Sequence, residues 1–131
     1  MNKCVMLSIY PEYVEKIFNG SKRFEYRRRL PRLCAGTRVL VYATAPISSV
    51  VGEFMIGEHL TLSPSHLWAI TSNGAGLSRD KFDAYFEGRD VAHALSVSRP
   101  RRYDRPRPLR DYGLKAAPQS YAWVTICKDD R

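Results

Sequence analysis

The sequence predicts a small α+β barrel. Several short runs of β-branched and aliphatic residues have strand character, and helix-like segments are inserted near the start and in the middle of the chain. These segments do not alternate regularly, as strands and helices do in βαβ units. A chain of 131 residues has the length of one domain, so residues 1–131 are expected to form one. With 44% hydrophobic residues, the core should need neither metal nor disulfide bonds.

The first third of the chain predicts a strand, a helix and a second strand. Residues 4–9, CVMLSI, have the composition of a short buried strand, and residues 11–20, PEYVEKIFNG, follow as a short helix. Pro11 suits the first turn of this helix, and Gly20 suits its C-terminal cap. Residues 21–30, SKRFEYRRRL, then alternate in character as a strand does.

The middle of the chain contains the longest apolar runs. Residues 37–45, TRVLVYATA, predict a central strand, and residues 48–62, SSVVGEFMIGEHLTL, predict another. Gly52 and Gly57 inside the second run indicate a β-bulge or a close crossing of two backbones. Barrels bend their strands at such points, which agrees with the predicted fold class.

The remaining segments predict two helices and two strands. The helices are expected over residues 63–73 and 77–88, and the strands over residues 89–97 and 119–128. Ser78 is a suitable N-cap for the second helix, and Gly88 a suitable stop. The aromatic residues of the helices, Trp68, Phe82, Tyr85 and Phe86, have a spacing typical of packing against a barrel, although an exposed one could stack on a base.

The charge of the chain indicates an anionic partner. Lysine and arginine total 21 against 13 acidic residues, a net charge of +8. Residues 99–113 are rich in arginine and proline and predict an extended loop or edge. Interleaved Arg101, Arg102 and Tyr103 are typical of a contact with single-stranded RNA. A solvated loop that its prolines hold extended explains the same composition equally well.

Cysteine and histidine patterns favour neither a metal site nor disulfide bonds. Cys4 and Cys127 lie in apolar runs and predict buried thiols, and Cys34 forms no paired spacing with either. The histidines, His59, His66 and His93, show no metal-ligand spacing, so no metal is expected. A ribonuclease of the two-histidine type would need two of them to converge in space, which the sequence leaves open. No apolar run has the length of a membrane helix and no signal peptide is recognisable, so a cytoplasmic protein without membrane contact is expected.

Residues 20–27, GSKRFEYR, match the pattern G-x-K-x-x-E-x-R. Together with residues 7–31, 39–54, 78–88 and 118–123, they resemble the ASCH domain family, and in particular bacterial ASCH proteins described as predicted transcriptional regulators. The resemblance covers nearly the whole chain. It implies a PUA-like β-barrel with a cleft that accepts RNA or a nucleotide. No cofactor is expected. The oligomeric state stays open.

The resemblance implies alternative activities for such a cleft. Some ASCH proteins resemble ribonucleases that act on single-stranded RNA. Another branch hydrolyses the amide of acetylated cytidine nucleosides with a lysine at the position of Lys22. That branch has a threonine where this chain has Glu25, which argues against deacylation here. A protein-interaction module or transcriptional co-regulator is a further alternative.

Lys22, Glu25 and Ser120 are the candidate catalytic residues. Glu25 near Lys22 favours a permanently charged ammonium, which suits phosphate binding or transition-state stabilisation better than proton abstraction. Ser120 is expected beside the cleft, but it has no recognisable His/Asp partner for a nucleophilic role. Glu25 could accept from a base edge or a ribose hydroxyl.

The remaining candidates are expected to bind nucleic acid. Arg27 shares a strand face with Glu25 and would take phosphate, with Arg28 and Arg29 as a basic rim. Thr44 ends a strand at the expected mouth of the barrel. The other expected contacts are Arg101, Arg102, Tyr103, Gln119 and Tyr121.

Overall fold

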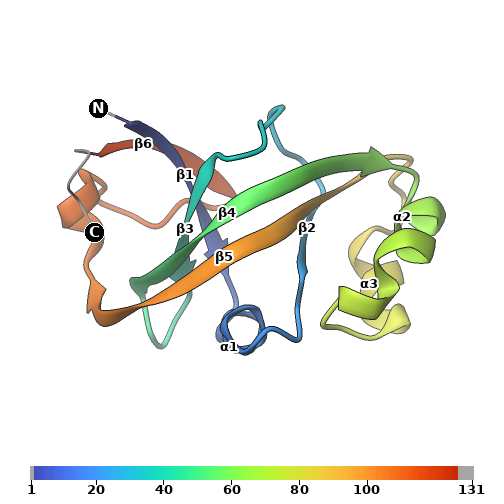
Figure 1. Cartoon of the computed structure of the whole chain (residues 1–131), viewed down its shortest axis with the longest axis horizontal. Coiled ribbons are helices and arrows are strands. Elements are labelled where there is room, and N and C mark those ends of the chain that lie inside the picture. The colour runs from blue at the N-terminus through green and yellow to red at the C-terminus, as the bar shows by residue number, and fades with distance from the viewer. Residues whose placement is uncertain (1, 127–131) are drawn as a thin grey trace.

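The computed structural model describes residues 2–126 and shows one mixed six-stranded sheet with helices packed around it (Figure 1). The strands are β1 (Asn2–Ile9), β2 (Phe24–Arg27), β3 (Arg38–Ala43), β4 (Ser49–Leu62), β5 (Ala92–Arg107) and β6 (Tyr121–Ile126). The helices are α1 (Pro11–Asn19), α2 (Pro64–Thr71) and α3 (Arg79–Tyr85), with the 3₁₀ turns η1 (Ser72–Gly74) and η2 (Leu109–Tyr112). The predicted α+β class is confirmed.

The sheet is open, with the strand order β2-β5-β4-β3-β1-β6. Strands β1 and β3 run parallel, and the other neighbouring pairs are antiparallel. Closure of the predicted barrel is not shown, because β2 and β6 stand at opposite ends of this order and no pairing among residues 2–126 joins them. A side chain bridges the two ends instead: Arg27 of β2 donates hydrogen bonds to Ser120, the residue before β6.

The long strands β4 and β5 bend through several register shifts. Their pairing shifts between Val50 and Gly52 and again between Ile56 and His59. A Cβ atom at Gly52 would lie 2.6 Å from the carbonyl oxygen of Arg101, so only glycine allows the backbones to approach this closely. The close crossing predicted at Gly52 is therefore confirmed.

The three helices cover two parts of the sheet. α1 ends at Gly20, whose φ of 89° is left-handed as predicted, and it buries Val14 and Ile17 in the main core. α2 and α3 lie together at the right-hand end of the sheet in Figure 1. Their buried side chains join a second core with β2, in which the Tyr26 and Phe82 rings are 5.0 Å apart, edge to face.

Residues 99–107 belong to β5. Of the two predictions for this segment, an extended loop or the edge of a sheet, the edge is correct. These residues pair with β4 on one side, while β2 pairs only with the N-terminal part of β5 and ends where Arg27 faces His93. Prolines are tolerated here because, at the edge of a sheet, some backbone N–H groups have no strand to donate to, so their loss breaks no hydrogen bond. Predicted strand 21–30 is shorter than expected, since β2 begins at Phe24.

The remaining predictions concern cysteines, metals and membranes. Cys4 is buried and Cys34 is exposed, while Cys127 lies outside the described residues. Within residues 2–126, no three metal-ligating side chains gather in one place. In the same part of the chain, no helix has the length and apolar character needed to cross a membrane.

Candidate functional site

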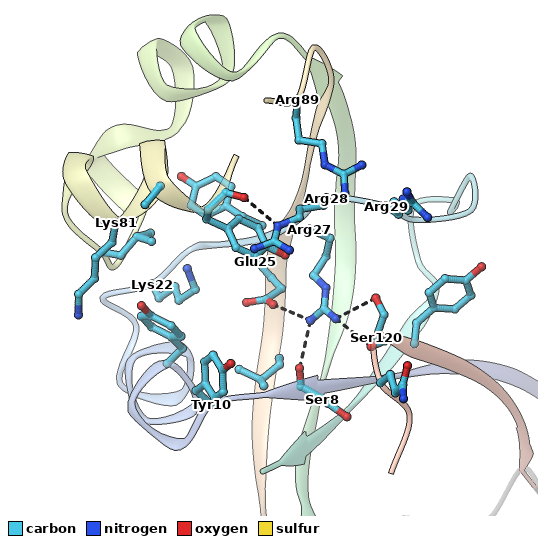
Figure 2. A pocket seen from close by; sticks show the side chains of 18 residues that line it. Ser8, Tyr10, Lys22, Glu25, Arg27, Arg28, Arg29, Lys81, Arg89 and Ser120 are labelled. Atoms are coloured by element: carbon cyan, nitrogen blue, oxygen red, sulfur yellow. Dashed lines mark hydrogen bonds and ion pairs between the residues drawn. The ribbon is translucent and has the colours of Figure 1, made fainter. Parts of the chain in front are cut away.

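A cleft of about 970 Å³ opens beside β2. The end of β1, helix α1, helix α3 and the residues before β6 form its other walls (Figure 2). Six cationic side chains line it, against a single carboxylate, Glu25. The cations are Lys22, Arg27, Arg28, Arg29, Lys81 and Arg89. Five tyrosines complete the wall: Tyr10, Tyr13, Tyr26, Tyr85 and Tyr121.

Arg27 is the structural centre of the cleft. Its Nη1 donates to the carbonyl oxygen of Ser8 at 3.1 Å and to Oε2 of Glu25 at 3.2 Å. Its Nη2 donates to the carbonyl oxygen of Ser120 at 2.9 Å and to Oγ of Ser120 at 3.1 Å. The guanidinium therefore connects β1, β2 and the start of β6, as the dashed lines in Figure 2 show.

The loop before β6 is also held by Ser8. Its hydroxyl donates to the carbonyl oxygen of Pro118 at 2.6 Å. Together with Arg27, this contact places Ser120 in the wall of the cleft, although Ser120 is separated by 93 residues from Arg27 along the chain. Glu25 and Arg27, two residues apart on β2, form the predicted side-by-side pair. Both side chains are at most 10% exposed.

Lys22 is 3% exposed, which is rare for a lysine. Its Nζ donates to the carbonyl oxygen of Ala75 at 2.7 Å and lies 5.2 Å and 4.8 Å from the ring centroids of Tyr13 and Tyr26. The loop that supplies Ala75 continues through Gly76, which packs directly on the Lys22 side chain.

Burial lowers the pKa of Lys22 below its ordinary value, although the charge of Glu25 opposes this shift. The predicted ion pair of Lys22 with Glu25 is absent among the described residues, because Glu25 pairs with Arg27. The net shift of the Lys22 pKa is downward, opposite to the direction that the predicted pairing implies. The strand begins after Lys22, so its alternation does not set the direction of this side chain.

The tyrosines differ in their surroundings. Burial raises the pKa of Tyr26 to about 12, and its hydroxyl shares a hydrogen bond of 2.7 Å with Thr71. Arg28 lies over the Tyr85 ring at 4.4 Å and donates from Nε to the Tyr85 carbonyl oxygen at 2.8 Å. Tyr10 is 66% exposed, and its ring lies 6.4 Å from that of Tyr13.

The structure brings most of the predicted site residues together. Those that line the cleft are Lys22, Glu25, Arg27, Arg28, Arg29, Gln119, Ser120 and Tyr121. Thr44 does not line it and lies in the turn after β3. Arg101 and Arg102 also lie outside the cleft and form ion pairs with Glu53 and Glu15.

Tyr103, also outside the cleft, is 7% exposed and donates a hydrogen bond of 2.8 Å to Glu53. Such a ring is not available for stacking on a base. Sequence reasoning missed Ser8, Tyr13, Lys81 and Arg89. The sequence offered one indication that Tyr13 lines the cleft, because it lies in the segment just before the G-x-K-x-x-E-x-R pattern. Its helical spacing, however, predicts packing in the core equally well.

Two of the three histidines do converge. Nε2 of His59 lies 3.0 Å from Nδ1 of His93, which the sequence had left open. Neither histidine lines the cleft, so this pair is not part of the candidate site.

An open mixed sheet with a tyrosine-lined cleft beside β2 defines the class: a small α+β protein with a cleft whose wall is mainly cationic. The ASCH domain family matches residues 7–101, and the chain belongs to this family. The resemblance noted on the sequence is thereby confirmed.

Relatives with this fold are known in bacteria. The chain is 31% identical to the ASCH domain-containing ribonuclease of Zymomonas mobilis, over 93% of this chain and 84% of that protein. The crystal structure of a tyrosine-to-phenylalanine variant of ZmASCH from Z. mobilis matches with a TM-score of 0.87 and 29% identity, over 95% of this chain and 91% of that one.

A longer relative is also similar. Large ribosomal subunit protein uL22 of Ureaplasma parvum is 29% identical over 92% of this chain. The chain spans only 39% of the length of that protein.

Proposed function

We propose that the cleft binds single-stranded RNA. The observation that carries this proposal is the composition of the cleft wall: six cations and five tyrosines surround one buried carboxylate. Cations attract the phosphate backbone without regard to sequence, and aromatic rings stack on the exposed faces of unpaired bases. The wall therefore has the two features that binding of a single strand requires.

The residues divide between contact and support. The guanidinium of Arg27 donates to Ser8, Glu25 and Ser120, so it positions the wall and does not take phosphate. The side chains of Arg29 and Arg89 form no hydrogen bond or ion pair within residues 2–126 and are free to bind phosphate. Glu25, the one carboxylate of the wall, suits a base amino group or a ribose hydroxyl.

Fluorescence anisotropy with a labelled single-stranded RNA tests the binding proposal. Affinity should fall as salt rises, and Arg29→Ala should reduce the slope of log affinity against log salt by about 0.7, the effect of one lost phosphate contact on a single strand. Arg110→Ala is the matched control, because Arg110 is exposed and lies outside the cleft. Salt-independent binding, or equal effects of both variants, would contradict the proposal.

We infer a second activity for the same cleft: cleavage of the bound RNA without a metal. Two observations favour it. A relative that matches 93% of this chain is named a ribonuclease. Burial also lowers the pKa of Lys22, which increases the fraction of neutral amine that can accept a proton.

In this reaction the Lys22 amine takes the proton of a ribose 2′-hydroxyl and becomes an ammonium. The 2′-oxygen forms a bond to phosphorus, the bond from phosphorus to the 5′-oxygen breaks, and the 5′-oxygen takes a proton from water. The hydroxide that remains takes the proton of the Lys22 ammonium, which restores the amine and the water. The products are a 2′,3′-cyclic phosphate and a 5′-hydroxyl. Cations of the wall such as Arg28 and Arg29 stabilise the negative charge that develops on the phosphorane.

Incubation of labelled RNA in EDTA separates binding from cleavage. Wild type should produce fragments with cyclic phosphate ends, and Lys22→Met should produce none while still binding RNA. If wild type leaves the RNA intact, the ribonuclease hypothesis is wrong and only the binding hypothesis stands. The same two proteins, tested on acetylated cytidine, decide the deacylase alternative, in which acetate would be released instead.

A further inference from the structure

A chain of hydrogen bonds connects β4, β5 and the segment that follows β2. The backbone N–H of Leu33 donates to Nδ1 of His59 at 3.1 Å. Nε2 of His59 lies 3.0 Å from Nδ1 of His93, and Oγ1 of Thr61 lies 3.2 Å from the same nitrogen. Residues 28–35, which join β2 to the turn before β3, are called the arginine segment below.

The chemistry of the donors fixes the protonation of both rings. A backbone N–H can only donate, so Nδ1 of His59 must carry a lone pair. The proton of the neutral His59 ring is therefore on Nε2, from which it donates to His93. Nδ1 of His93 accepts this bond and carries no proton, and the Thr61 hydroxyl shares the same lone pair at 3.2 Å. Both rings have to be neutral for the chain of bonds to form.

Protonation of either ring breaks one of these bonds. A proton on Nδ1 of His59 would face the Leu33 N–H, and a proton on Nδ1 of His93 would face the N–H of His59. Burial lowers the pKa of both histidines. For His59, the charges of His93 and Arg32 lower the pKa further, and the backbone contact with Leu33 opposes this shift. On β2, Arg27 stands opposite His93, with its guanidinium directed to Ser8 and Ser120.

The arginine segment carries part of the cleft wall. Arg28 and Arg29, at its start, line the cleft. Leu33 is 5% exposed and packs in the main core, and its N–H bond to His59 ties the segment to β4. The next such bond runs from Gly36 N–H to the carbonyl oxygen of Ile56. The position of Arg29 therefore depends on the attachment of the segment at Leu33.

We propose that His59 and His93 are positioning residues that hold the arginine segment against the cleft only while both rings are neutral. Acidification breaks the bond to Leu33, moves Arg29, and weakens binding of RNA in the cleft. This direction is informative, because added positive charge by itself strengthens the binding of a polyanion. The inference rests on the proposed RNA binding for its functional consequence, but its structural part does not.

The structural part is tested without RNA, by hydrogen exchange of the Leu33 amide from pH ~8 to pH ~5, the range in which histidines titrate. Protection, corrected for the intrinsic pH dependence of exchange, should fall in wild type as pH falls through the lowered pKa values of the two histidines, below the ordinary value of about 6.5. His59→Asn should keep its protection, since the amide oxygen of asparagine can accept from Leu33 and does not titrate. His66→Asn, on the exposed start of α2, should behave as wild type. Wild-type protection that does not change with pH overturns the proposal.

The functional part is tested by anisotropy with a uridine-only RNA, whose bases do not titrate in this range. Loss of one hydrogen bond predicts that the RNA affinity of wild type is about two- to tenfold weaker at pH ~5 than at pH ~8. The affinity of His59→Asn should not weaken between these pH values. Tighter wild-type binding at low pH, or the same loss in His59→Asn, overturns the proposal. If RNA does not bind at either pH while protection of the Leu33 amide still depends on pH, the proposed RNA binding is wrong. The pH-dependent attachment of the arginine segment by the two histidines is then still supported.

Discussion

Arg27→Ala is the substitution whose effect on stability follows most directly from the structure. It removes four hydrogen bonds of 2.9–3.2 Å that join β1, β2 and the residue before β6. It also leaves the Glu25 carboxylate buried without its arginine. Removal of one partner of a buried ion pair typically costs about 3–5 kcal/mol.

The expected loss for Arg27→Ala is therefore about 4 kcal/mol, which corresponds to a fall of about 15 °C in Tm for a chain of this length. Urea unfolding followed by circular dichroism measures it. Arg105→Ala is the control, an exposed arginine of β5 that should change stability by less than about 0.5 kcal/mol.

A double-mutant cycle with Glu25→Ala separates the pair from the other contacts. The loss of unfolding free energy in the double variant should be smaller than the sum of the two single losses by about 1–3 kcal/mol. The reason is that the double variant leaves no buried carboxylate unpaired. A loss below about 1 kcal/mol for Arg27→Ala, or additivity within about 0.5 kcal/mol, would refute the argument that this guanidinium holds the cleft together.

Three further outcomes are expected. Lys22→Met should abolish RNA cleavage yet change the free energy of unfolding by less than about 1 kcal/mol, since burial already disfavours the ammonium; a loss above about 3 kcal/mol would indicate a structural lysine instead. Gly76→Ala should impair cleavage as well as stability, because its Cβ would meet the Lys22 side chain, whereas Gly113→Ala has the same left-handed backbone and open space and should affect stability alone. Phe82→Ala, in the α2–α3 core, should cost about 3–5 kcal/mol in urea unfolding, and exposed Ile70→Ala less than about 0.5 kcal/mol; equal effects would contradict the assigned core.

Local signals in the sequence were sufficient for most elements of the fold. Pro11 and Gly20 predicted the ends of α1, Ser78 predicted the N-cap of α3, and Gly52 predicted a close crossing, because each depends on a backbone preference of one residue. Residues 99–107 were harder, since proline and arginine suit both a solvated loop and the edge of a sheet. Pairing with β4, a contact distant in sequence, decided for the edge.

The G-x-K-x-x-E-x-R pattern identified residues that do line the cleft, but their partners could not be predicted. Sequence proximity suggested an ion pair between Lys22 and Glu25. In the fold, Glu25 contacts Arg27, and Lys22 turns to the carbonyl oxygen of Ala75, which is 53 residues away. Burial then lowers the pKa of Lys22, an effect that depends on solvent exclusion by other segments.

The sequence by itself determined the α+β class, the family, the positive charge and the candidate residues of one short segment, because these depend on residue identity and local spacing. Only the tertiary structure decided which side chains meet. Arg27 with Ser120, and His59 with His93, are 93 and 34 residues apart. Contacts of this kind, together with the burial that shifts a pKa, arise when distant strands pack, and no local pattern records them.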